Sequence, residues 1–188
     1  MVLRDFCTEE RIMRFAEEAG LEMVKDESSD EPMGVVRDVA WRVIPGLILQ
    51  YVRDSRSGCS ILSVGGRPPE SAERIERSVE ENFKPWGLSE LVTEARSCQE
   101  KGDRMRAVLR AGVGAPAGFD RSFYEVIENA ISDEDPEIRW AGLWATSYSR
   151  WGEFRELVKN VMENDPEEVL RSQAGVILQG IDGDREAG

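Results

Sequence analysis

The sequence predicts an α+β N-terminal module, a helix with a β-hairpin or small sheet, followed by an all-α stack of helical repeats. The spacing of apolar residues changes from alternating to helical near residues 65–69. The tripeptide Asp-Pro-Glu also occurs twice in the second half, about thirty residues apart. We therefore divide the chain into an α+β module (1–66), linking amphipathic helices (67–102) and helical repeats with a short disordered tail (103–188).

The first 66 residues carry the signs of one helix and several strands. The segment 8–20, TEERIMRFAEEAG, has a capping threonine and a terminating glycine, so we expect a helix. Residues 21–34 predict a brief strand and then an acidic, mobile connection. Two β-rich runs, 40–52 and 59–64, flank the polar loop 53–58 and predict a hairpin. Pro45-Gly46 interrupts the first run, which predicts a bend or an edge strand there.

The rest of the chain has helical periodicity. Segments 70–83 and 88–102 place apolar residues three and four positions apart, and no strand is expected after Val64. Asp135-Pro136-Glu137 and Asp165-Pro166-Glu167 each predict the first turn of a helix, because aspartate caps free amides and proline lacks a donor that this turn cannot use.

The similarity around the two tripeptides extends further. Residues 123–137 match 154–168 with a shift of 31, and residues 106–112 resemble 139–145. Two helices per unit at this period indicate a helical repeat, in which stacked units share an apolar core. From Asp103 to Ile181 the chain resembles the HEAT-like repeat family, in its short bacterial form with a DPE-x-R helix. DPEEVLR departs from that form by an insertion, and the first unit lacks Asp-Pro. The resemblance implies a non-catalytic protein-binding role.

Composition restricts the chemistry. The net charge is −13, made up of −4 over 1–66, 0 over 67–118 and −9 over 119–188. Such a chain repels phosphate backbones and anionic lipid surfaces, so we expect a basic protein as partner and neither nucleic acid nor membrane. The sequence has no histidine, which excludes histidine-based catalysis and the usual zinc sites. We expect no enzyme activity, no metal site and no cofactor.

The cysteines and the N-terminus point to a cytoplasmic protein. Cys7, Cys59 and Cys98 are odd in number and far apart, so they predict small apolar side chains rather than a disulfide framework. The first fifteen residues have no apolar run of signal-peptide length.

Aromatic residues gather on the helix that Asp135 begins. Trp140, Trp144, Tyr148 and Trp151 follow at intervals of four, four and three, which predicts one stripe on one helix face. Such a stripe is usually core between repeats, but it can also anchor a partner.

Two further sets of candidate residues lie in turns. Acidic residues Asp133, Glu134 and Glu163 precede the two Asp-Pro-Glu helices and are expected on one edge of the stack, where they would attract a basic partner or only cap and solvate the helices. Gly65, Gly66 and Arg67 join a strand to a helix, and this turn is either a simple connection or an anion site.

Three functions are consistent with these features. The leading interpretation is a non-catalytic adaptor or inhibitor, including an immunity protein against a basic toxin, that uses the acidic, aromatic repeat surface. The alternative is a small-molecule-binding regulatory module in the N-terminal part, whose element order distantly resembles secretion-chaperone domains. An enzyme similar to HEAT-like lyases or DNA glycosylases is disfavoured because no catalytic set of residues and no basic face is present.

Overall fold

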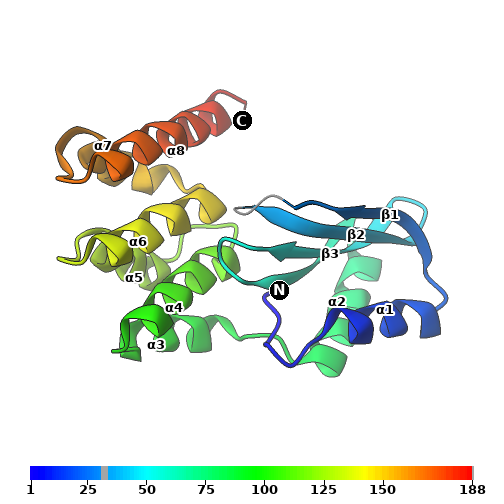
Figure 1. The fold of residues 1–188 in the computed structure, drawn as a ribbon. Helices are drawn as coiled ribbons and strands as arrows, with labels where there is room; N and C mark the ends of the chain where they lie inside the picture. Colours follow the sequence, from blue (N-terminus) through cyan, green and yellow to red (C-terminus); the bar gives the residue numbers. More distant parts are fainter. Residues whose placement is uncertain (31–33, 188) are drawn as a thin grey trace. The chain divides into compact units, whose positions relative to one another are not determined.

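The computed structural model describes residues 1–30 and 34–187, and it divides the chain into two compact units, Met1–Trp86 and Gly87–Gly188 (Figure 1). The first unit contains a helix, a four-stranded antiparallel sheet and a second helix, and the second unit is a stack of helices. The predicted fold class is therefore confirmed.

The elements of the first unit follow one another as a meander. They are α1 (Glu9–Glu18), β1 (Glu22–Ser28), β2 (Val35–Ile44), β3 (Leu47–Asp54), β4 (Ser60–Gly66) and α2 (Pro69–Phe83). Neighbouring strands pair in sequence order, β1-β2-β3-β4. Thr8 caps α1 as expected. The predicted mobile connection after β1 includes residues 31–33, which lie outside the described residues.

Pro45-Gly46 does not bend one long strand, as the sequence suggested. The two residues are the tight turn of a hairpin, in which Ile44 pairs with Leu47 and Gly46 has a φ of +85°. Glycine adopts this left-handed conformation without steric cost. The run 40–52 therefore supplies parts of two strands, and the expected hairpin around 53–58 is the next one, β3 with β4.

Side chains from one face of the sheet and from both helices form the core of the first unit. Val39 and Trp41 of β2 lie two residues apart on one face of their strand, and so do Leu49 and Tyr51 of β3. These side chains pack with others of the same cluster, Leu3, Cys7, Ile12, Ala16, Leu62, Val79 and Phe83. Because Val79 and Phe83 belong to it, α2 is part of the first unit. The compact units meet between Trp86 and Gly87, later in the chain than the boundary expected after residue 66.

The second unit consists of three helical hairpins within the described residues. They are α3 (Leu88–Ser97) with α4 (Lys101–Gly114), α5 (Arg121–Ile131) with α6 (Pro136–Ser149), and α7 (Arg155–Asn164) with α8 (Glu168–Ala187). A short 3₁₀ turn, Gly152–Phe154, precedes α7. Helices α4, α6 and α8 form one layer in which each contacts the next (Figure 1).

The closest approach is between α4 and α6. Gly112 of α4 lies so near Ala145 of α6 that a β-carbon at Gly112 would come within 2.6 Å of the Ala145 backbone. Gly142 of α6 is similarly close to the backbone of Ile131 in α5, at 2.6 Å. These contacts leave no room for a side chain, so the two glycines set the spacing of the helices around α6.

Candidate functional site

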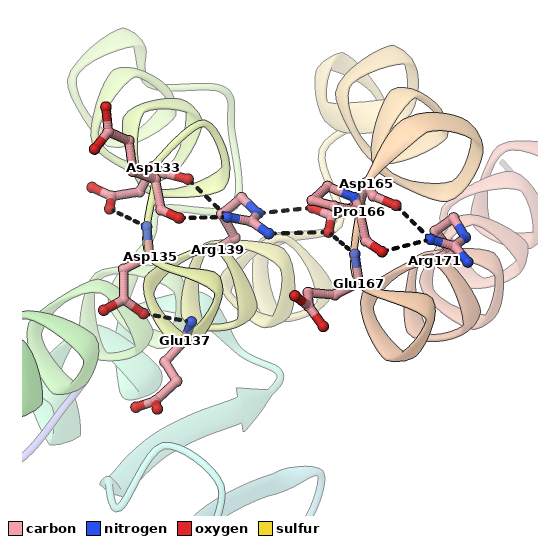
Figure 2. A network of polar contacts seen from close by, with 9 residues as sticks. Asp133, Asp135, Glu137, Arg139, Asp165, Pro166, Glu167 and Arg171 are labelled. Atoms are coloured by element: carbon pink, nitrogen blue, oxygen red, sulfur yellow. Dashed lines mark hydrogen bonds and ion pairs between the residues drawn. The ribbon is translucent and has the colours of Figure 1, made fainter.

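A row of arginine–aspartate pairs joins successive hairpins of the second unit. Arg139 of α6 donates to both carboxylate oxygens of Asp165, from Nε at 2.8 Å and from Nη2 at 3.1 Å (Figure 2). Its Nη1 donates to the carbonyls of Asp133 and Glu134 in its own hairpin turn. The guanidinium of Arg139 therefore binds both the turn between α5 and α6 and the turn between α7 and α8. The side chains are 11% and 4% exposed, so the pair is almost fully removed from water.

Arg104 and Arg171 occupy the corresponding positions in the neighbouring hairpins. Arg104 of α4 forms an ion pair with Asp133 at 2.6 Å, as Arg139 does with Asp165. Arg171 of α8 donates Nη1 to the carbonyls of Asp165 and Pro166, as Arg139 does to its own turn (Figure 2). We call the three arginines, with the aspartates that they contact, the arginine ladder. Sequence analysis missed it, although arginine stands six residues after the turn aspartate in both Asp133–Arg139 and Asp165–Arg171.

The ladder gives a different repeat register from the one that the matching tripeptides suggest. Asp133 accepts from the amide of Asp135, and Asp165 accepts from the amide of Glu167, in both cases three residues before a helix begins. Asp133 and Asp165 are therefore equivalent, with a shift of 32. The prediction that Pro136 begins a helix is confirmed. The same prediction for Pro166 is wrong, because α8 begins at Glu168.

The ladder also shifts the ionisation of its carboxylates. The amide of Asp135, with Arg104, lowers the pKa of Asp133 below 3.8. Burial alone would raise the pKa of Asp165, but the hydrogen bonds from Arg139 and from the Glu167 amide outweigh burial and lower it. A carboxylate that accepts such bonds is stabilised in its charged form. Both aspartates therefore hold their charge in structural contacts rather than present it to solvent.

The aromatic stripe of α6 contains three residues rather than four. Trp140, Trp144 and Tyr148 are half-buried on this helix. The rings of Trp140 and Trp144 lie 6.5 Å apart, and the indole N–H of Trp144 donates to Gln173 of α8 at 3.2 Å. The stripe therefore lies partly against α8 and partly open.

Trp151 does not belong to that stripe. Helix α6 ends at Ser149, and Arg150 has a φ of 52°, which turns the chain away. Trp151 is buried, stacks on Phe154 with ring centroids 5.6 Å apart, and donates its N–H to the carbonyl of Pro116. Helical spacing placed it on the stripe because the helix ends at a left-handed arginine, Arg150, whereas the glycine that would signal an end, Gly152, comes only after Trp151.

Exposed glutamates surround the ladder. Residues 133–137 and 163–168 contain eight carboxylates. All three aspartates and Glu137 pair with Lys101, Arg104 or Arg139 within 3.1 Å, and Glu163 lies 3.9 Å from Lys159. Among the described residues, no cation pairs with the three exposed glutamates that remain, Glu134, Glu167 and Glu168. We call Glu134, Glu163, Glu167 and Glu168 the acidic edge.

The turn at residues 65–67 has a structural explanation. Gly65 and Gly66 pair with Ile48 and Leu47 at the end of β4, and a β-carbon at Gly66 would meet the Gly46 carbonyl at 1.9 Å. Arg67 is exposed. An anion site at this helix N-terminus would need free amides, but Pro68 and Pro69 have none. The glycines therefore permit close backbone packing, and the anion site at Gly65, Gly66 and Arg67 stays a prediction.

The described residues contain two other features that bear on function. A cavity of about 300 Å³ in the first unit is lined by Arg4, Thr8, Glu9, Tyr51, Arg53 and Ser60, among others.

No helix in the described ranges combines the length and the apolar character needed to cross a membrane.

Comparison with known proteins finds no significant match to this chain among protein-family models, curated proteins or solved structures.

Proposed function

We propose that this chain is a non-catalytic protein-interaction module, an adaptor or inhibitor, whose C-terminal HEAT-like unit binds a basic protein. The observation that carries the proposal is the acidic edge. Its four glutamates are exposed beside the arginine ladder. Arg104 and Arg139, the arginines nearby, are already paired with the aspartates of the ladder. Three of them, Glu134, Glu167 and Glu168, pair with no cation among the described residues. Exposed carboxylates on a rigid scaffold attract a cationic partner and raise its association rate.

The aromatic stripe supports the same role. Trp140 follows Arg139 directly in α6, the helix whose first turn is preceded by Glu134 of the acidic edge. Half-buried tryptophans need little ordering on binding and are common at the centre of protein interfaces. In this proposal the glutamates steer the partner and Trp140 with Trp144 forms the apolar contact. One form of such a protein is an antagonist that covers the cationic cleft of a toxin or nuclease.

The test is affinity capture on the immobilised full chain from a lysate of the source cells, with elution in steps of salt. We expect one basic protein to be retained in a stoichiometric amount and released at raised salt, because screening weakens exposed charge pairs. Replacing Glu134, Glu163 and Glu167 with glutamine should move elution to lower salt. The matched control replaces three exposed glutamates of α2, Glu73, Glu80 and Glu81, and should leave elution unchanged.

Two results would contradict the proposal. The first is that the full chain retains no stoichiometric partner. The second is that both triple variants release the partner at the same salt concentration as the parent chain.

The cavity in the first unit supports a second candidate function, small-molecule regulation. Its volume of about 300 Å³ is at the lower end of the range for ligand pockets. Its lining includes Arg4, Arg53, Glu9 and Tyr51, so a small polar molecule would suit it. A thermal-shift screen of polar metabolites tests this, with Arg53→Ala as the variant that should lose any stabilisation.

A further inference from the structure

The arginine ladder is incomplete at α8. Arg139 donates Nη1 to carbonyls of the turn that precedes α6, and it donates Nε and Nη2 to the carboxylate of Asp165 in the next hairpin. Arg171 makes the first set of contacts through Nη1, but within the described part of the chain its Nε and Nη2 have no partner, and Figure 2 draws no interaction from them. This open side of a guanidinium has the geometry for a carboxylate.

An apolar surface lies beside the open guanidinium. Counted from the ladder arginines, Leu109 of α4, Trp144 of α6 and Val176 of α8 are equivalent, each five residues further on. Leu109 is 3% exposed, Trp144 is half-buried, and Val176 is 63% exposed. Val169, two turns before Val176, is 62% exposed. The position of Val176 is thus buried or half-buried in the earlier hairpins and exposed on α8, whereas the positions equivalent to Val169, Gly102 and Glu137, are exposed in them too.

We infer that Arg171, Val169 and Val176 form a docking site for a helical hairpin of a partner protein, and that an aspartate in the hairpin's turn binds the open side of Arg171. The other two arginines of the ladder both take an aspartate from a hairpin turn, which defines the chemistry of the missing group. The inference rests on the proposed function, since it takes the C-terminal unit as protein-binding, and it adds a second contact surface.

A second copy of this chain does not supply the missing group through the first hairpin of its stack. The residue six positions before Arg104, equivalent to Asp133 and Asp165, is Cys98. A thiol is a weak acceptor and cannot replace a carboxylate that accepts from two guanidinium nitrogens. The ladder therefore does not continue head-to-tail between copies through this position, and the proposal assigns the aspartate to a partner protein.

The first test supplies the missing hairpin directly. Residues 1–182 are followed by a second copy of residues 151–187, which keeps the 32-residue register and places the copied Asp165 opposite Arg171. We expect a single unfolding transition with a higher urea midpoint than that of the original chain. Arg171→Gln should change the unfolding equilibrium constant at least ~10-fold more in the extended chain than in the original, and asparagine at the copied Asp165 should remove that excess. An extension that stays unfolded, or equal effects of Arg171→Gln in both chains, would overturn the site.

The second test identifies the occupant. A photo-crosslinking amino acid replaces Val176 in the full chain, which is then bound to the basic protein retained in the capture experiment. A crosslink to an aspartate-containing turn between two helices of that protein supports the inference. A crosslink to a second copy of this chain overturns it. If the partner is retained but no crosslink forms, the docking site fails and the proposed function stands, because the acidic edge alone then accounts for binding.

Discussion

Arg139 and Asp165 belong to different hairpins, and the guanidinium of one donates two hydrogen bonds to the carboxylate of the other, at 2.8 and 3.1 Å. Each residue also fixes a turn: Arg139 binds the carbonyls of Asp133 and Glu134, and Asp165 accepts from the amide of Glu167. The pair therefore couples the start of α8 to the start of α6. It organises the surface on which the acidic edge is displayed.

The ladder predicts acid sensitivity of the second unit. The pKa values of Asp133 and Asp165 lie below 3.8 in the folded state, so the unfolded chain binds more protons at low pH. Their contribution to stability is full above the unfolded pKa and is lost as pH falls below 3.8 toward the folded values. Urea unfolding between pH 6 and pH 3, a range chosen around the unfolded pKa of about 3.9, measures this. Asp165→Asn should make the free energy of unfolding depend less steeply on pH. If the variant shows the same pH dependence as the parent chain, Asp165 does not contribute to the acid sensitivity.

The close contact between α4 and α6 predicts opposite effects of alanine at two helical glycines. Gly112→Ala should destabilise the chain by about 1–3 kcal/mol, because the new methyl group meets the Ala145 backbone. Gly180→Ala in α8 has open space and should be neutral or stabilise by up to about 1 kcal/mol through helix propensity. Denaturant unfolding of the two variants measures both effects. Equal effects would contradict the packing.

The separation of Trp151 from the α6 stripe predicts different roles for two tryptophans. Trp151→Ala should cost about 3–5 kcal/mol, because the ring is buried between Phe119 and Phe154. Trp140→Ala should cost less in folding but weaken retention of the partner. Thermal unfolding and the capture experiment together measure the two effects. The assignment fails if Trp151→Ala leaves stability unchanged.

Much of the fold was predictable because its signals are local. Thr8 and Asp135 cap helices where the sequence places them, and alternation over residues 59–64 marks β4. The boundary between the units was not predictable, since helical spacing in α2 does not show that Val79 and Phe83 pack on the sheet. Local pattern identifies an element's apolar face but not the element that covers it.

The candidate site was predictable only in part for the same reason. The sequence reveals the acidic turns, but Asp133 and Asp165 serve the ladder while Glu134 and Glu163 stay exposed. Which acidic residues pair with an arginine and which stay exposed depends on where the arginines lie in space, and the sequence does not show this. The repeated Asp-Pro-Glu also obscured the repeat register. The two tripeptides are 30 residues apart in sequence, whereas the equivalent turn residues Asp133 and Asp165 are 32 apart.

The most direct test of the ladder is a double-mutant cycle in urea unfolding with Arg139→Gln and Asp165→Asn. A cycle with Arg121→Gln and Glu125→Gln serves as control, since this pair lies within α5 with side chains 77% and 41% exposed. We predict a coupling energy of about 1.5–3 kcal/mol for Arg139 with Asp165 and below about 0.5 kcal/mol for the control. If the effects of Arg139→Gln and Asp165→Asn simply add, the hairpins are not joined by this ladder and the account of the second unit is wrong.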